Sequence, residues 1–246
     1  MSEFLTSTIE ELHRRKSVRV FTDREITPER KKAILEAACQ APTAGNQQMY
    51  TVLDITDPEL KAALADSCDH QPFIAKAKMV LVFCADFCKW YDGFLAAGCE
   101  PRAPGAGDLM LAVSDATIAA QNAVVAAESL GIGSCYIGDI MENCERQREL
   151  LHLPRYVFPA AMLVFGYPDE SQVRRPKPPR APLEGIVQEN TYRRRDAAEL
   201  EALFGCKRPD SMPYEPWMQA FCKRKYNSDF SREMTRSVEK FLEDYR

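Results

Sequence analysis

From Asp108 to Leu130 the chain carries a long stretch of mostly apolar and small residues. Alanines recur along it at helical spacing, at Ala116, Ala119, Ala120, Ala123 and Ala127. A helix that is apolar nearly all round must be buried, and small residues let its backbone approach neighbouring elements closely. With Asp108 as its cap, this helix would be roughly 33 Å long. Because it also contains Asp115 and Gln121, the stretch predicts a helix of a core or an interface and not a membrane span.

Around this helix, shorter helical and strand patterns alternate irregularly. Capped patterns with a helical period predict helices at about 7–15, 28–39, 57–67, 142–151, 196–203 and 228–245. Apolar runs predict strands at 49–55, 79–84, 132–137 and 161–165. The order shows no internal repeat and predicts an α+β fold. We expect one domain over residues 1–192 and an extension over 193–246 that packs on that domain or on a partner subunit.

Composition narrows the class of protein. A net charge of −4 and a pI near 5.6 argue against a general nucleic-acid binder. The 9 cysteines are scattered without a C-x-x-C pair, which is typical of reduced thiols and predicts no bound metal. The first four residues lack the pattern of a secretory signal, and no run of eighteen apolar residues occurs. The sequence therefore predicts a soluble cytoplasmic protein.

A cluster of cations lies early in the chain, at Arg14, Arg15, Lys16 and Arg19, with Ser17 among them. It is followed directly by an apolar segment, so its position is that of a turn entering packed structure. Arginine, lysine and serine are donors that bind phosphate groups, arginine through its planar fork. The cluster therefore indicates a phosphate site, although a solvated charged face is the alternative.

Three further segments carry groups that bind flat, polar ligands. The segment 41–48 is a loop by composition and supplies amides, 131–138 ends a strand with glycine, and 175–180 is a stiff, proline-rich run with more cations. No histidine, serine or cysteine accompanies them in a catalytic arrangement, since His13, His70 and His152 lie in unrelated contexts. Cations, amides and glycine without an acid–base pair indicate that a bound cofactor performs the chemistry.

With these segments in order, the chain resembles the nitroreductase family of flavin enzymes from about residue 5 to Tyr192. Its tail is similar to one subgroup, the major oxygen-insensitive nitroreductase and flavin reductase P. The resemblance rests on the segments 15–21, 41–48, 82–87, 119–131, 136–138 and 189–192, together with Gln71. It implies a mainly antiparallel central sheet flanked by helices, and a homodimer that binds FMN.

The resemblance also implies a function. The protein would pass a hydride from NADPH or NADH through flavin N5 to nitroaromatic, quinone or similar planar acceptors. Alternatives are an NAD(P)H:flavin reductase, an enone reductase, or a flavin-binding protein without turnover. Neither the physiological acceptor nor the choice between NADPH and NADH can be derived from the sequence.

Residue roles follow from the same resemblance. Arg15, Lys16 and Ser17 would bind the FMN phosphate, and Arg19 would lie near the N1–O2 edge of the flavin. The remaining cofactor-binding residues would be Pro42, Thr43, Ala44, Asn46, Gln48, Gln71, Tyr136, Ile137, Gly138, Lys177 and Arg180. No side chain would act as the catalytic group, because Arg19 and Gly138 would only tune the flavin.

Two parts of the chain leave alternatives open. The family usually reads Lys-Pro-Arg where this chain separates Lys177 from Arg180 by two prolines, so which of the two contacts FMN stays open. Arg224 and Lys225 would bind the 2′-phosphate of NADPH, or would belong to a solvated run. Residues 87–107 would form either core packing or a lid.

Overall fold

The computed structural model describes residues 6–246, so the first four residues, on which the signal argument rests, lie outside the described part. Two compact units divide the chain. One unit runs to Arg175 and resumes at Glu233, and the other comprises Pro176–Arg232. The expected boundary after residue 192 stays a prediction.

A four-stranded sheet forms the centre of the first unit, in the order β1-β2-β4-β3. The strands are β1 (Tyr50–Asp54), β2 (Met79–Asp86), β3 (Gly133–Ile137) and β4 (Val157–Gly166). All neighbouring strands pair antiparallel, which confirms the expected sheet. The strand expected at 161–165 begins earlier, and Pro159 lies beside a shift in register opposite Phe83 and Cys84. Because proline cannot donate to a ladder, it is tolerated at such an irregularity.

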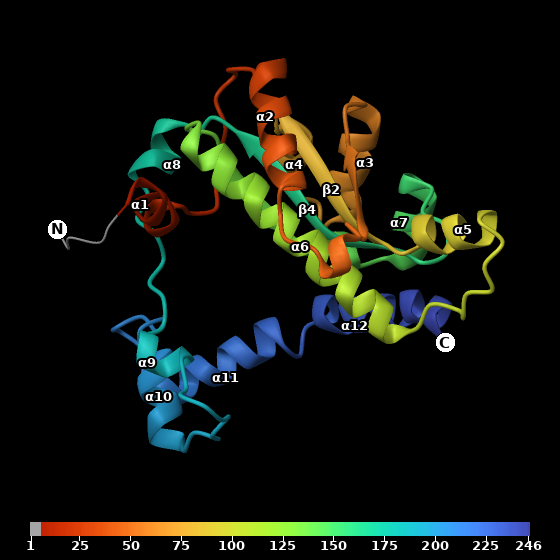
Figure 1. Cartoon of the computed structure of the whole chain (residues 1–246). Helices are drawn as coiled ribbons and strands as arrows, with labels where there is room; N and C mark the ends of the chain where they lie inside the picture. Colours follow the sequence, from red (N-terminus) through yellow and green to blue (C-terminus); the bar gives the residue numbers. More distant parts are fainter. Residues whose placement is uncertain (1–5) are drawn as a thin grey trace. The chain divides into compact units, whose positions relative to one another are not determined.

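Helix α6 (Ala106–Ser129) packs along the sheet and contacts all four strands, with α2 (Pro28–Cys39) beside it (Figure 1). The predicted N-cap was wrong, because Gly105 is the cap and Asp108 lies three residues inside the helix. There the Asp108 carboxylate accepts from Gly105 N at 2.8 Å, while Asp108 N donates to Gly105 O. This reciprocal pair satisfies two backbone donors at the helix end.

The alanines of α6 meet the sheet. Ala112, Ala116, Ala119, Ala120 and Ala123 have no exposed surface. Among the described residues α6 is also the one helix whose length and composition would suit a membrane span, a test that buried core helices pass as well. Its contacts with four strands are those of a core helix.

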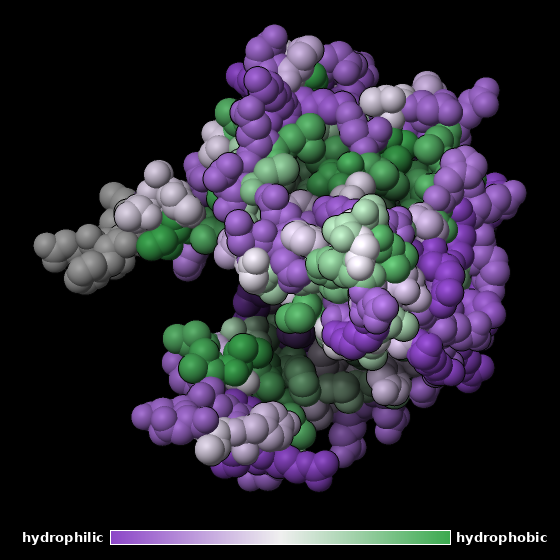
Figure 2. Space-filling view, turned by 45° about the vertical axis from the view of Figure 1, so that its right-hand side comes forward, coloured by the Kyte–Doolittle hydropathy of each residue, from purple (hydrophilic) through white to green (hydrophobic). Residues whose placement is uncertain are grey.

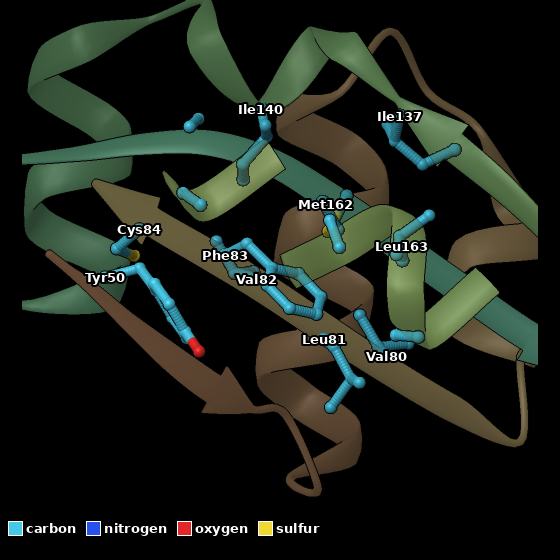
Figure 3. Close-up of a cluster of buried hydrophobic side chains, with 14 of the residues drawn as sticks. Tyr50, Val80, Leu81, Val82, Phe83, Cys84, Ile137, Ile140, Met162 and Leu163 are labelled. Carbon is cyan, nitrogen blue, oxygen red and sulfur yellow. The ribbon is translucent and has the colours of Figure 1, made fainter. Parts of the chain in front are cut away.

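The hydrophobic core includes the sheet and lies between α6 and the helices on the opposite face of the sheet. Figure 3 shows Val80, Val82, Phe83, Met162 and Leu163 gathered along neighbouring strands. Each of these five side chains is fully buried. The continuous apolar run of β2 therefore reflects a strand that is covered on both faces, as its pattern predicts.

The other elements follow the expected order, with several short additions. The first unit also contains α1 (Ser7–Arg14), η1 (Ala44–Asn46), α3 (Pro58–Ser67), α4 (Pro72–Lys76), α5 (Cys88–Ala96), η2 (Gly138–Met141), α7 (Cys144–Leu151), α8 (Glu170–Arg174) and η3 (Glu243–Tyr245). Pro176–Arg232 contains α9 (Leu183–Ile186), α10 (Ala197–Gly205) and α11 (Tyr214–Lys225), and α12 (Asp229–Leu242) begins there. The sequence patterns missed α4, α8, α9 and α11.

Candidate functional site

The basic segment after α1 is seated on one end of the sheet by two glycines. Gly133 and Gly166 are paired opposite each other on β3 and β4. A Cβ atom on Gly133 would lie 2.6 Å from Val18, and one on Gly166 would lie 2.6 Å from Phe21. Val18 N also donates to Ser134 O at 2.9 Å. Because these two glycines have no side chain, the basic segment can pack against the strands. This packing fixes where the cations of the segment lie.

Two arginines beside Ser17 retain unsatisfied donors. Arg175 Nη2 donates to the backbone oxygen of Ser17. Arg175 Nε and Arg15 Nη1 are buried and have no acceptor among the described residues. Burial removes the hydrogen bonds of a donor to water, and without a partner in the protein nothing compensates for that loss. The pair therefore fits an anionic group such as a phosphate.

Arg175 was missing from the predicted site, although it begins the cationic run 175–180. Lys16 donates through Nζ to Val173 O at 2.8 Å and to Arg175 O, and its expected contact with the phosphate stays a prediction. Lys16 thereby ties the end of α8 to the basic segment. The available signal for Arg175 was its place directly before the first proline of the run.

Arg19 and Gln71 lie near each other through α4. The Arg19 guanidinium is 6.0 Å from the ring centroid of Phe73, the second residue of α4, and Gln71 precedes that helix. Gln71 Nε2 donates to Cys68 O at 2.8 Å. Arg19 is exposed, and its backbone N donates to Gln172 Oε1. Arg19 and Gln71, 52 positions apart in the sequence, are therefore both next to α4.

The loop after α2 is held by a residue that sequence reasoning did not assign. Asp115 of α6 accepts from Thr43 Oγ1, from Ala44 N at 3.0 Å and from Met49 N at 3.1 Å. Trp90 of α5 adds a second attachment, since its Nε1 donates to Gln47 O at 2.8 Å. Trp90 packs against the core, so this part of residues 87–107 supports the loop.

These contacts determine which groups of the loop stay available. Gln48 Nε2 donates to Cys39 O at 3.1 Å, so this side chain is turned back to the end of α2. Asn46 is exposed, and its side chain makes no hydrogen bond within the described chain. Pro42 is exposed and Ala44 half-buried. Of the expected ligands in the loop, the Asn46 carboxamide is the polar side chain that remains available.

The end of β3 lies beside the basic segment. Tyr136 OH donates to Gln121 Oε1 of α6 at 3.3 Å, and burial raises the pKa of Tyr136 to about 12 against a weaker opposing effect of Arg15. Ile137 is buried, whereas a Cβ on Gly138 would meet no atom within 4 Å. Tyr136 therefore remains partly exposed within the electrostatic reach of Arg15, and the space around Gly138 is open.

Helix α6 connects these segments in series. Asp115 holds the loop 43–49, Gln121 binds Tyr136, and Glu128 pairs with Arg14 at 3.4 Å. The first and last of these helix positions are roughly 20 Å apart at the usual rise per residue. These three segments are thus each attached to α6 at a different position along its length.

The remaining expected residues belong to Pro176–Arg232, which is a separate compact unit. Lys177 is half-buried and Arg180 is exposed. Arg224 and Lys225 end α11, where the Arg224 guanidinium lies 5.5 Å from the ring centroid of Phe221. Their roles, like those of every residue carried over by resemblance, stay predictions.

Comparison with known proteins is consistent with this arrangement. The sequence profile of the nitroreductase family matches residues 12–167, which is more than half of the chain. The chain belongs to the nitroreductase family. The family resemblance and the expected α+β fold are thereby confirmed, and the protein is an oxidoreductase of this family.

Two curated relatives illustrate the similarity. The protein named "FMN reductase [NAD(P)H]" of Bacillus subtilis strain 168 is 31% identical over 243 residues, covering 97% of this chain and 92% of its own. The "Oxygen-insensitive NADPH nitroreductase" of Salmonella typhimurium strain LT2 is 37% identical over 188 residues, covering 76% and 75%.

Solved structures of the nitroreductase family agree. The nitroreductase NfrA1 of B. subtilis superposes with a TM-score of 0.76 at 29% identity, covering 93% of this chain and 98% of its own. The NADPH:FMN oxidoreductase of Vibrio harveyi, solved in complex with NAD+, gives 0.77 at 25% identity, covering 96% and 98%.

Proposed function

We propose that this FMN-dependent NAD(P)H oxidoreductase reduces small planar acceptors such as nitroaromatics and quinones. One observation carries the proposal: Arg15 Nη1, two residues before Ser17, and Arg175 Nε, whose Nη2 donates to Ser17 O, are both buried without an acceptor among the described residues. A phosphate at this position would satisfy both. The names of the curated relatives support FMN and a reduced nicotinamide as the partners of the site.

Each part of the site has a role in this proposal. Arg15, Arg175 and Ser17 hold the phosphate, Asn46 and Gln71 offer amides to the ribityl chain or the pyrimidine, and Tyr136 lines the ring. When bound, FMN supplies two-electron chemistry by accepting a hydride from the nicotinamide and delivering it to an acceptor. The protein therefore needs no acid–base pair of its own.

Arg19 contributes charge, and Gly138 contributes access. The Arg19 guanidinium is exposed beside α4, where it can stabilise negative charge on a neighbouring ring. The surroundings of Gly138 are open, so a flat ligand can approach its backbone. A site that recognises a ring through access and stacking accepts planar molecules of several kinds.

The protein acts as a cytoplasmic homodimer in this proposal. Three apolar residues of α6 remain exposed, namely Met110 (64%), Leu111 (50%) and Ile118 (40%). Figure 2 shows hydrophobic residues exposed among hydrophilic ones on the face that it draws. Apolar surface gathered on one helix is typical of an interface, and a second copy would cover it.

The nicotinamide completes the proposal. Lys223, Arg224 and Lys225 form the last turn of α11, where Arg224 and Lys225 offer two exposed cations to the 2′-phosphate of NADPH. Residues 1–192 form the FMN-binding domain, and 193–246 its extension.

Purified protein tests the proposal directly. The protein should be yellow, and heat should release FMN. Anaerobic NADPH or NADH should bleach the flavin, and a panel of nitroaromatics, quinones, enones and free flavins should identify the acceptor.

Release of FAD, or no flavin after reconstitution, would contradict the FMN site. Bound FMN that neither nicotinamide bleaches would instead indicate a flavin protein without turnover. Free FMN as the best acceptor would favour the flavin-reductase alternative, which the name of the B. subtilis relative supports.

A further inference from the structure

Asp115 is a buried acid without a cation. Only 2% of its surface is exposed, and no lysine, arginine or histidine of the described residues forms an ion pair with it. A buried carboxylate persists only where hydrogen bonds replace its water shell. Its three hydrogen-bond donors among the described residues all come from the loop 43–49, since Thr43 Oγ1, Ala44 N and Met49 N converge on it. The acid and the loop therefore depend on each other.

The loop has a backbone that needs such support. Gly45, Asn46 and Gln48 all adopt left-handed conformations, with φ of 58°, 57° and 48°. Asparagine and glutamine in this region carry backbone strain that persists only where surrounding contacts hold it. Asp115 binds the loop on both sides of these residues, at Ala44 and at Met49.

The same contacts fix the direction of the Thr43 hydroxyl. A hydroxyl has one proton to donate, and that of Thr43 goes to Asp115. Its oxygen in turn accepts from Gln48 N at 2.7 Å. Thr43 therefore has no proton left for a ligand. The loop presents the exposed Asn46 carboxamide instead.

We infer that Asp115 is the positioning residue of the cofactor site: it turns the donors of the loop inward and thereby holds Asn46 toward the flavin. This inference rests on the proposed FMN site. It assigns Thr43 an internal role in place of the expected ligand contact, and it makes an acid of the core helix responsible for cofactor affinity.

The test combines Asp115→Asn, Thr43→Val and the double variant, all in the full chain. An asparagine offers one acceptor oxygen and directs an NH2 group at a donor, so at least one loop contact is lost. We expect the Kd for FMN to rise roughly tenfold to hundredfold, the range for one hydrogen bond to a charged group. Amide hydrogen exchange over residues 43–49 should also accelerate. Thr43→Val should weaken FMN binding in the wild type and add little to Asp115→Asn.

A matched control separates positioning from general stability. Asp108 is a second acid of α6. Its carboxylate pairs with Arg102 and accepts from Gly105 N, and within the described part of the chain it forms no hydrogen bond with the loop. Asp108→Asn should lower the melting temperature of the apoprotein while leaving the FMN Kd unchanged. If Asp115→Asn also lowers the melting temperature and leaves the FMN Kd unchanged, Asp115 has a merely structural role and the inference is overturned.

The remaining outcomes of these experiments also test the inference. A folded Asp115→Asn protein with unchanged FMN Kd and loop exchange contradicts the inference, as does a Thr43→Val effect of equal size in both backgrounds. If Asp115→Asn does not fold, Thr43→Val decides, because unchanged loop exchange in that variant contradicts the inward role. If the wild type binds no FMN, the proposed function fails, whereas loop exchange in the apoprotein still shows whether Asp115 holds the loop.

Discussion

The two ends of the site differ in how their donors are satisfied. At the basic segment, Arg15 and Arg175 have buried nitrogens that find no acceptor within residues 6–246. In the loop 43–49, the hydroxyl of Thr43 and the amides of Ala44 and Met49 all bind Asp115. Under the proposed function an anionic ligand would complete the first region, whereas the second is complete without one. Charge binds the ligand at one end, whereas a preformed shape receives it at the other.

The largest effect should come from removing the unsatisfied donors. We expect Arg175→Ala and Arg15→Ala each to raise the FMN Kd roughly tenfold to hundredfold, because each loses a charge-assisted hydrogen bond to the phosphate. Fluorescence titration of the apoprotein measures this. Riboflavin, which lacks the phosphate, should bind wild type and variants alike.

Arg174→Ala is the matched control, since Arg174 is exposed and pairs with Glu170 on its own helix. If Arg175→Ala weakens riboflavin as much as FMN, the guanidinium does not bind the phosphate. The contrast between the two ends of the site would then be wrong.

A smaller effect is expected at Arg19, which belongs to the basic segment and lies beside α4. Arg19→Ala should leave FMN affinity nearly unchanged and lower the reduction potential by roughly 20–60 mV, from about 1–3 kcal/mol of charge stabilisation. The potential is measured by equilibration with a reference dye. Equal loss of FMN from the Arg19 and Arg15 variants, with equal potentials, would show that both cations act on the phosphate.

Sequence patterns succeeded where structure is set by neighbouring residues. The helix from Pro28 was predicted because its cap, Thr27, lies directly before it and accepts from Arg30 N. The strand β2 was predicted because both of its faces are buried. The strand predicted for its partner β4 was too short, because Pro159 interrupts the strand pattern. Only the pairing register of β4 with β2 shows that this proline fits in the strand.

The site was less accessible to such reasoning because its contacts are distant in sequence. Asp115 binds a loop 71 residues away, and nothing near it in the sequence indicates that partner. Among the cations of the run 175–180, composition cannot distinguish which one faces Ser17. In the structure, α8 ends directly before Arg175, and Lys16 Nζ donates to the backbone carbonyl of Arg175. These two features determine that Arg175 faces Ser17.

The smallest expected effect concerns an acid outside both regions. Glu142 follows the segment that carries Tyr136 and Gly138, is 5% exposed, and has an oxygen without a partner among the described residues. Burial raises its pKa from 4.5 to about 7, and the neighbouring acids Asp139, Asp69 and Glu233 add to the shift.

Because the folded protein then binds a proton that the unfolded chain releases, stability should fall as pH rises from about 4.5 to about 7. Melting temperatures of the apoprotein across this range should therefore decrease, and Glu142→Gln should flatten the decrease. Glu145→Gln is the control, since the hydrogen bond to Arg236 lowers the pKa of Glu145 to about 2 and keeps it ionised throughout. If wild type and Glu142→Gln show the same slope, Glu142 is ionised in the folded protein. If the slope appears only with FMN bound, the titrating proton belongs to the ligand site and not to Glu142.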